Sequence, residues 1–281
     1  MLQALAACEK ATRSGPWKGM SQARDGRTRE HPRRPLVLIP ALGGSEELLA
    51  PFVAALSSSL EVTVLEPPGF GDAPSPVGAP STRTLARAAL ELWDEEGLGR
   101  ADLFGISLGG MVAQWMALEA PDRIGRLVLA STTDLGLRAL AGAGLRELAM
   151  ARCLLLPEGD AMACLTAEVL DDGPAASPEV EAQAEHAARA HPRSKGDLLW
   201  LTAAAAAHDT RSELADLETH TLVLSGEADG LIPLDDQRAM AARLPHAHHI
   251  TLSELGHDIT LESPERTAAT VLDFLAPPPP R

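Results

Sequence analysis

Six short apolar runs, separated by segments of helical periodicity, constrain the fold of this chain more than any other feature. Such runs, bounded by turn signals, are typical of buried strands in a parallel sheet. They lie at residues 36–39, 62–65, 101–106, 126–130, 221–225 and 249–252, and the clearest helical patterns lie at 48–57, 85–95, 108–119, 234–244 and 264–275. Strands that alternate with helices predict βαβ units with right-handed crossovers. We therefore expect an α/β fold with a mostly parallel sheet and helices on both faces.

One long stretch interrupts this alternation. From residue 135 to residue 218 the sequence is rich in Ala and Leu at helical spacing and contains no convincing strand. Because it falls between two predicted strands, we interpret it as a helical cap inserted into a core formed by residues 36–134 and 219–276. Residues 277–281 are expected to form a Pro-rich tail.

The first 35 residues differ in charge from the rest of the chain. They contain eight Lys/Arg and three Asp/Glu and show no periodicity, which predicts a disordered basic arm. The whole chain has 24 Lys+Arg and 39 Asp+Glu, a formal net charge of −15. A phosphate backbone would repel so acidic a protein, so we expect no nucleic-acid partner. No apolar run approaches the roughly 18–20 residues that span a bilayer, so we expect no membrane partner and a cytoplasmic protein.

The number and positions of the cysteines and histidines argue against a disulfide framework and against a bound metal ion. The three cysteines, Cys8, Cys153 and Cys164, are an odd and sparse set. They predict no disulfide framework and fit a reducing compartment. His246 and His248 would share one face of a strand, but no Cys or carboxylate nearby completes a ligand set. We therefore expect no metal.

The segment Gly105-Ile-Ser107-Leu-Gly109 carries the strongest chemical signal. It follows a predicted strand and opens a predicted helix, which is the context that a G-x-S-x-G nucleophile requires. Glycines on either side of Ser107 remove the Cβ atoms that would clash in so sharp a turn. The start of the following helix provides backbone N–H groups and the positive end of its dipole. We predict that Ser107 is a nucleophile.

A serine hydroxyl needs a base, and the base needs an acid that orients it. Both are expected after later strands, in the order Ser, acid, His. Asp229 follows the predicted strand at 221–225, and His257 follows the one at 249–252. Asp134 and Glu227 are alternative acids, and we favour Asp229 because of the geometry of the triad.

The developing oxyanion needs two backbone donors. One is expected to be the N–H of Leu108, directly after the nucleophile. The other is expected in the loop after the first strand, where Gly43 and Gly44 permit close approach to a substrate, and we assign it to Leu42.

The cap should determine which substrates bind. An insertion between the strands predicted at 126–130 and 221–225 lies over the carboxyl edge of the sheet, where α/β proteins bind ligands. Its apolar residues are therefore candidates for the substrate pocket. Met150, Leu155 and Trp200 are our candidates, and packing of the cap against the core is the alternative reading.

These features together resemble the α/β-hydrolase superfamily, over residues 36–275. The similar motifs are Pro68-Gly-Phe-Gly71, Gly105-Ile-Ser-Leu-Gly-Gly-Met-Val-Ala-Gln-Trp115, Ala120-Pro-Asp-Arg123 and Gly226-Glu-Ala-Asp229. The resemblance is closest to small serine esterases and to 3-oxoadipate enol-lactonases, and it implies that Ser107 is the nucleophile, Asp229 the acid and His257 the base. Two departures are Pro40-Ala41, where many members have His-Gly, and the lack of a pattern for an N-terminal antiparallel hairpin.

We therefore expect a serine hydrolase that cleaves small carboxylic esters or lactones through an acyl-enzyme, with no cofactor. A serine nucleophile excludes the haloalkane dehalogenases of this superfamily, which need a carboxylate. Acyl transfer on the same triad is one alternative, and a non-catalytic ligand-binding member of the fold is the other.

Overall fold

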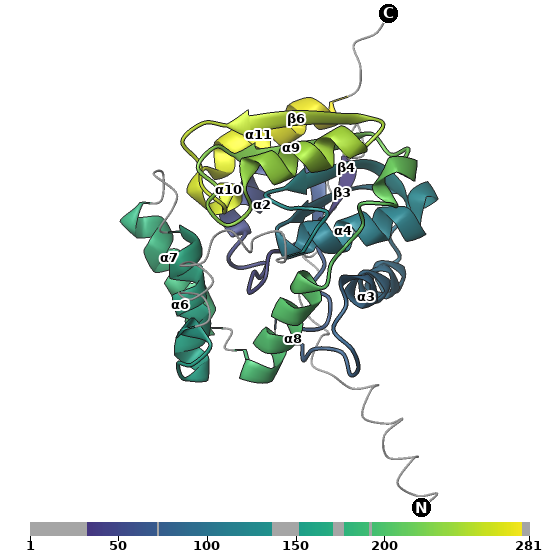
Figure 1. Ribbon diagram of the computed structural model, residues 1–281. Helices are drawn as coiled ribbons and strands as arrows, with labels where there is room; N and C mark the ends of the chain where they lie inside the picture. Colours follow the sequence, from purple (N-terminus) through teal and green to yellow (C-terminus); the bar gives the residue numbers. More distant parts are fainter. Residues whose placement is uncertain (1–32, 72, 137–151, 171–176, 191–192, 277–281) are drawn as a thin grey trace, which may run out of the picture. The chain divides into compact units, whose positions relative to one another are not determined.

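A single sheet of six parallel strands forms the centre of the protein, in the order β2-β1-β3-β4-β5-β6 (Figure 1). The computed structural model describes residues 33–71, 73–136, 152–170, 177–190 and 193–276. The strands are β1 (Arg34–Ile39), β2 (Leu60–Val64), β3 (Ala101–Ile106), β4 (Ile124–Ala130), β5 (Thr221–Gly226) and β6 (Ala247–Leu252). Every neighbouring pair is parallel, so the predicted α/β fold is confirmed.

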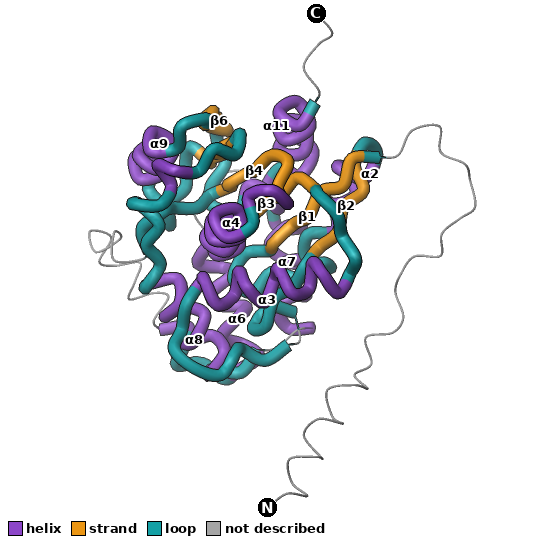
Figure 2. The backbone as a smooth tube through the Cα atoms, turned by 90° about the vertical axis from the view of Figure 1, so that its right-hand side faces the viewer, coloured by secondary structure: helices purple, strands orange, loops and turns teal. Residues whose placement is uncertain are grey.

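Helices cover both faces of this sheet (Figures 1 and 2). The core helices are α2 (Ala50–Ser57), α3 (Thr82–Glu95), α4 (Leu108–Glu119), α9 (Leu234–Arg243), α10 (Ile259–Glu262) and α11 (Pro264–Leu275), with short 3-10 turns at Pro121–Arg123 and Leu214–Asp216. Alternate residues of β1 face opposite ways, as the period of a strand requires. Val37 and Ile39 pack in one apolar cluster with α3, α4 and α9, whereas Leu36 and Leu38 pack in another with α2, α10 and α11.

Between β4 and β5, the described part of the chain includes three more helices: α6 (Glu158–Leu170), α7 (Pro178–Ala190) and α8 (Lys195–Ala206). They pack on the core through apolar contacts. Met162 and Leu165 of α6 lie in a cluster with Leu42, and Leu201 of α8 belongs to the main cluster on the α4 face of the sheet. None of the described helices is long and apolar enough to cross a membrane.

The inserted segment leaves and rejoins the core at one narrow neck. Leu135 and Asp209 form an isolated antiparallel bridge. On either side of it, the Thr210 N–H donates to the Asp134 carbonyl at 2.9 Å, and the Gly136 N–H donates to the His208 carbonyl at 2.6 Å. The two ends of the insertion therefore run side by side.

The expectation that the cysteines form no disulfide is wrong. Cys153 and Cys164 are joined by a disulfide, which ties the helical residues 152–153 to α6. The sequence shows only three scattered cysteines, and their pairing depends on how the helical segments of the insertion pack. The cysteine content therefore no longer favours a reducing compartment.

The first strand begins two residues earlier than the predicted start of the core. Arg34 and Pro35, assigned to the arm from the sequence, pair with β2. The guanidinium of Arg34 lies 2.9 Å from the carboxylate of Asp102, whose side chain is 2% exposed. Burial raises the pKa of Asp102, while Arg34 and Arg126 oppose that rise. Residues 1–32 of the predicted arm and the tail at 277–281 lie outside the described residues.

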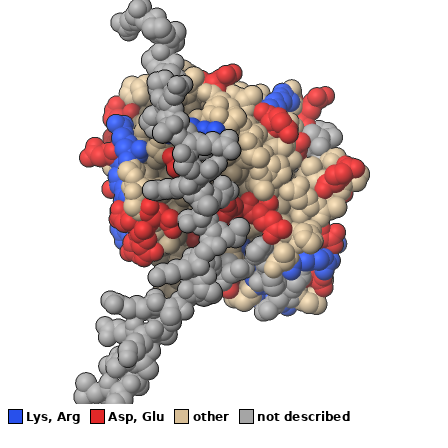
Figure 3. All heavy atoms as spheres, turned by 180° about the vertical axis from the view of Figure 1, so that it is seen from behind, with Lys and Arg blue, Asp and Glu red and all other residues tan. Residues whose placement is uncertain are grey.

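Charged side chains on the face seen in Figure 3 are of both signs, with acidic groups spread among basic ones. Elsewhere in the described residues, exposed charged groups form ion pairs, and Arg87 lies 2.9 Å from Glu119. Exposed pairs of this kind contribute about 0–1 kcal/mol each, so the sheet and its two apolar clusters account for the fold.

Removing residues 1–32 tests whether the predicted arm contributes to stability, and the Arg34→Ala variant provides the comparison. If the arm packs on nothing, a chain that begins at Arg33 keeps its free energy of urea unfolding within about 0.5 kcal/mol of the full chain. In the shortened chain, Arg34→Ala leaves the buried carboxylate of Asp102 without its ion-pair partner, and we expect a loss of about 1–3 kcal/mol. A truncation that costs more than Arg34→Ala contradicts the arm prediction.

Candidate active site

Ser107 lies at the sharp turn between β3 and α4, with φ 54° and ψ −120°. A positive φ is uncommon for any residue except glycine and marks local strain. Two glycines make the turn possible. A Cβ on Gly105 would lie 2.4 Å from the carbonyl oxygen of Gly109, and a Cβ on Gly109 would lie 2.2 Å from the carbonyl oxygen of Ile39. The sequence signal of flanking glycines therefore corresponds to close backbone approaches between β1, β3 and α4.

Hydrogen bonds hold the strained backbone of Ser107 from both sides. Its N–H donates to the carbonyl of Ala130 at 2.9 Å. Its own carbonyl accepts from the Thr132 hydroxyl at 2.7 Å and from the Gly110 N–H at 3.0 Å. Thr132 is fully buried just after β4. Its bond to the Ser107 carbonyl could not be predicted from the sequence, because a lone threonine after a strand belongs to no motif.

Three side chains from three separate loops meet at the carboxyl edge of the sheet. The Ser107 hydroxyl lies 2.9 Å from His257 Nε2. His257 Nδ1 lies 3.0 Å from Asp229 Oδ1 and 3.1 Å from Asp229 Oδ2. The side chains of His257 and Asp229 are 3% and 0% exposed. This arrangement can move a proton from a hydroxyl to an imidazole whose other nitrogen is held by a carboxylate.

The carboxylate of Asp229 accepts hydrogen bonds on both oxygens. Oδ1 accepts from the N–H groups of Leu231 at 3.0 Å and Ile232 at 2.8 Å. Oδ2 accepts from Gln237 Nε2 at 2.9 Å. A buried carboxylate with several hydrogen-bond donors is held in one orientation. Gln237, on α9, was not identified from the sequence.

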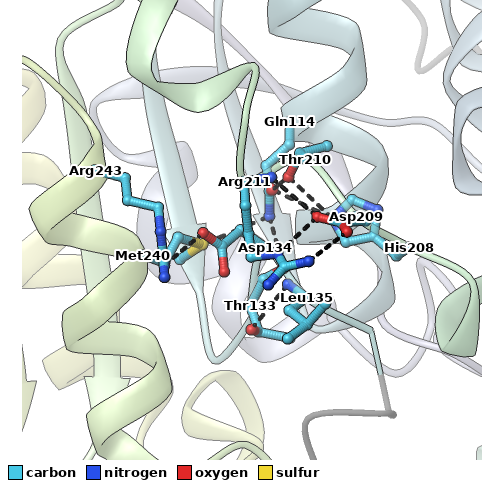
Figure 4. A network of polar contacts seen from close by, with 10 residues as sticks. All are labelled: Gln114, Thr133, Asp134, Leu135, His208, Asp209, Thr210, Arg211, Met240 and Arg243. Carbon is cyan, nitrogen blue, oxygen red and sulfur yellow. Dashed lines mark hydrogen bonds and ion pairs between the residues drawn. The ribbon is translucent and has the colours of Figure 1, made fainter.

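The two alternative acids do not contact His257. Asp134 forms an ion pair with Arg243 at 2.8 Å, within the polar network drawn in Figure 4. Burial raises the pKa of Asp134, and Arg243 opposes that rise. Glu227 is exposed and accepts from the Glu254 N–H at 3.4 Å. Asp229 is the acid that the structure brings to the imidazole.

Three carboxylates influence the charge of His257. Burial of the imidazole disfavours its protonated form, but Asp229, Asp258 and Glu262 outweigh burial and raise the pKa of His257. Burial also raises the pKa of Glu262, whose Oε2 accepts from the Gly256 N–H at 2.7 Å. The environment therefore favours the imidazolium that would form when His257 takes a proton.

A cavity of about 100 Å³ opens beside Ser107. Leu42 and Leu108, the two predicted oxyanion donors, both line it. Its other walls come from core loops and from the inserted helices, and most of them are apolar. The lining residues are Ala41, Leu42, Gly43, Gly44, Leu48, Leu49, Ile106, Ser107, Leu108, Met111, Met162, Leu165, Thr166, Thr202, Ala205, Leu231, Ile232, His257, Asp258 and Thr260.

Of the three cap residues predicted to line the pocket, the two that the structure describes do not line it. Leu155 is 81% exposed in the turn before α6 and does not line the cavity. Trp200 also does not line it, and its Nε1 donates to the Gly78 carbonyl at 3.0 Å. Met150 lies outside the described residues. Instead α6 contributes Met162 and Leu165, whose three-residue spacing on one helical face is the signal that could have found them.

Metal binding has little support within the described residues. Cys153, Cys164 and Glu168 are the only group there with atoms close enough to hold an ion. The two sulfurs are bonded to each other, so they are not the thiolates that metals bind. His246, considered above as a metal ligand, lies 2.9 Å from a carboxylate oxygen of Glu218, and the nearby His249 lies 2.9 Å from the Ser225 hydroxyl.

Comparison with known proteins gives consistent similarities. The profile of a protein family described as "alpha/beta hydrolase fold" matches residues 34–264. A poly(3-hydroxyalkanoate) depolymerase of Ectopseudomonas oleovorans is 29% identical, over 86% of this chain and 84% of its own length. A putative carbamate hydrolase, RutD, of Pseudomonas savastanoi pv. phaseolicola is 30% identical, over 85% of this chain and 93% of its own length.

Solved structures show the same fold. A hydrolase from Pseudomonas aeruginosa PA01 superimposes with a TM-score of 0.73 at 30% identity, covering 87% of this chain and 91% of that chain. The enol-lactonase from Burkholderia xenovorans LB400 superimposes with a TM-score of 0.74 at 25% identity, covering 88% of this chain and 93% of that chain.

The charge environment of His257 is testable without a substrate. Glu262→Gln removes one negative charge but keeps a carbonyl oxygen for the Gly256 N–H. Because Glu262 raises the pKa of His257, we expect this variant to lower that pKa, measured by NMR titration of the imidazole Cε1 proton. Glu227→Gln is the matched control, since Glu227 is an exposed carboxylate, and should leave the titration where it is. An unchanged pKa in Glu262→Gln contradicts the assignment.

Proposed function

Because the chain belongs to the alpha/beta hydrolase family, we propose that it is a serine hydrolase of small carboxylic esters or lactones that works through an acyl-enzyme. The observation that carries the proposal is the contact of 2.9 Å between Ser107 Oγ and His257 Nε2, with Asp229 behind the imidazole and an apolar cavity in front of the hydroxyl. A binding protein without catalysis would not require this alignment.

The chemistry follows from the roles of these three side chains. His257 Nε2 takes the proton of Ser107 as Oγ attacks the substrate carbonyl, and Asp229 keeps the other imidazole nitrogen protonated and oriented. The imidazolium then gives its proton to the leaving alkoxide, which departs from an ester or stays attached to the acyl group of a lactone. Water, activated by the same imidazole, releases the acid and restores Ser107.

The oxyanion of each tetrahedral intermediate would be held by the N–H groups of Leu42 and Leu108. Both residues line the cavity that contains Ser107. Leu42 precedes Gly43, whose φ of 77° is open to glycine without strain. A Cβ at Gly43 would overlap the side chain of Met162, so the oxyanion loop and α6 are in direct contact.

The cavity supports a small, apolar acyl group. Its mainly apolar lining favours an apolar acyl group over a charged one. Two of the similar proteins are named as a poly(3-hydroxyalkanoate) depolymerase and an enol-lactonase, and the bonds in such a polymer and in a lactone are esters. The putative carbamate hydrolases make carbamates the second substrate class, because the same serine and base can attack a carbamate carbonyl.

Replacing the nucleophile tests the proposal directly. Ser107→Ala should abolish labelling by a fluorophosphonate and lower kcat on p-nitrophenyl acetate by about 10⁴–10⁶-fold. Near-UV circular dichroism should stay unchanged, since the variant loses one hydroxyl at the mouth of the cavity. Labelling that survives in Ser107→Ala would exclude Ser107 as the nucleophile.

Two aspartates provide a matched comparison for the acid. Asp229→Asn should lower kcat by up to about 10⁴-fold, because the amide no longer holds the imidazole in the required tautomer. Asp134→Asn removes a similarly buried carboxylate that pairs with Arg243, and it should leave kcat within about threefold. A larger kcat loss in Asp134→Asn than in Asp229→Asn refutes the assignment.

The inserted helix α6 should set the preference for acyl-chain length. Met162→Ala enlarges the cavity, so kcat/KM for hexanoate relative to acetate esters should rise about 10-fold. Because Met162 is 3% exposed, we also expect a stability loss of about 2–5 kcal/mol in urea unfolding. Leu155→Ala, in the exposed turn before the same helix, is the control and should change neither quantity. An unaltered chain-length series in Met162→Ala would mean that α6 does not contact the acyl group.

A further inference from the structure

A chain of hydrogen bonds leads from Asp229 away from the cavity. Asp229 Oδ2 accepts from Gln237 Nε2 at 2.9 Å. Gln237 Oε1 accepts from the Ser225 hydroxyl at 2.7 Å, and Ser225 Oγ lies 2.9 Å from His249 Nε2. Gln237 and Ser225 are fully buried, whereas His249 is half-buried on β6. The chain therefore joins α9, β5 and β6 behind the candidate acid.

The direction of each hydrogen bond in this chain follows from counting donors. Gln237 Nε2 faces two acceptors, the Asp229 carboxylate and the Ile232 carbonyl at 2.9 Å, so the amide nitrogen must point toward Asp229. The amide oxygen then faces Ser225, which gives it its only hydroxyl proton. Ser225 Oγ has no second proton to give, so His249 Nε2 must be the donor to it.

This direction does not depend on the charge of His249. The neutral ring that carries its proton on Nε2 donates to Ser225, and the charged ring donates from the same nitrogen. In both states Ser225 gives its proton to Gln237, and Gln237 gives an N–H to Asp229. The amide of Gln237 is therefore held in one of its two orientations whatever the charge of His249.

Building on the proposed hydrolase function, we propose that Gln237 is a positioning residue for the reaction. Its amide N–H fixes Asp229 Oδ2 beside His257, and Ser225 and His249 keep that amide from turning its oxygen toward the carboxylate. The reversed amide would place a carbonyl dipole against the anion and leave Asp229 with fewer donors. The imidazole that Asp229 orients would then be held less firmly against Ser107.

A second buried glutamine supplies a matched comparison. Gln114, on α4, is also fully buried, and its Oε1 accepts from the Thr210 hydroxyl near His208 (Figure 4). Its Nε2 donates to the Thr133 carbonyl at 3.0 Å. This set repeats the amide, hydroxyl and imidazole of the first chain, yet among the described residues the side-chain hydrogen bonds of Gln114 reach none of Ser107, His257 and Asp229.

The decisive experiment compares Gln237→Met with Gln114→Met on a p-nitrophenyl ester. Both remove a buried amide at similar volume, so both should lose stability. Gln237→Met should lower kcat about 10- to 100-fold with KM nearly unchanged, because the loss falls on orientation of the base rather than on binding. Gln114→Met should keep kcat within about threefold. Equal kcat losses in the two variants would overturn the proposal.

Variants of Ser225 test the orienting role separately. Ser225→Ala leaves Gln237 Oε1 without a donor, so kcat should fall several-fold, and Ser225→Thr, which keeps a hydroxyl, should restore most of it. A wild-type kcat in Ser225→Ala would overturn the orienting role. These variants also keep the test available if Gln237→Met fails to fold.

A readout that needs no turnover separates this proposal from the proposed function. The His257 Nδ1 proton, hydrogen-bonded to Asp229, should give a downfield ¹H NMR resonance that shifts or broadens in Gln237→Met and stays in place in Gln114→Met. If the protein hydrolyses no ester and Ser107 is not labelled, the hydrolase proposal fails while this resonance still tests the positioning. If Ser107→Ala abolishes activity but Gln237→Met alters neither kcat nor the resonance, only the positioning role fails.

Discussion

The left-handed backbone of Ser107 is the constraint on which the rest of the structure depends. A non-glycine residue in such a conformation costs about 1–3 kcal/mol and persists only where its surroundings over-determine it. Here Gly105 and Gly109 let β1, β3 and α4 approach at backbone contact, and buried Thr132 bonds to the Ser107 carbonyl. The fold thus holds the Ser107 hydroxyl in place before any ligand arrives.

The parallel sheet and the buried charges make separate contributions to the surroundings of this hydroxyl. The sheet brings the loops after β3, β5 and β6 to one edge, where Ser107, Asp229 and His257 meet. Carboxylates then favour the protonated imidazole in a place where burial alone would disfavour it. The cavity wall is mostly apolar, with His257 and Asp258 among its polar members, while Asp229 lies behind the imidazole and outside the lining. Apolar walls of low dielectric strengthen electrostatic interactions inside the site.

The sequence predicted what depends on local patterns and missed what depends on distant packing. The strands were recognisable from apolar runs, and Ser107 from a strand, a glycine turn and a helix in succession. The same reasoning chose Leu155 for the pocket, because an apolar residue in the insertion carries no mark of the direction it faces. Gln237 was overlooked because its importance comes from Asp229 and Ser225, eight and twelve residues away in the chain and on other elements. The Cys153–Cys164 bond was missed for a similar reason.

The neck formed by Leu135 and Asp209 bears on how such a protein can diversify. The insertion enters and leaves the core at adjacent positions, and Ser107, Asp229 and His257 all lie outside it. A segment whose two ends lie together can be exchanged for another of different length without moving the framework around it. Recombination at this neck would therefore exchange the helices beside the cavity and leave the cluster of Ser107, Asp229 and His257 in place, so that the shape of the cavity and the geometry of this cluster can evolve as separate traits.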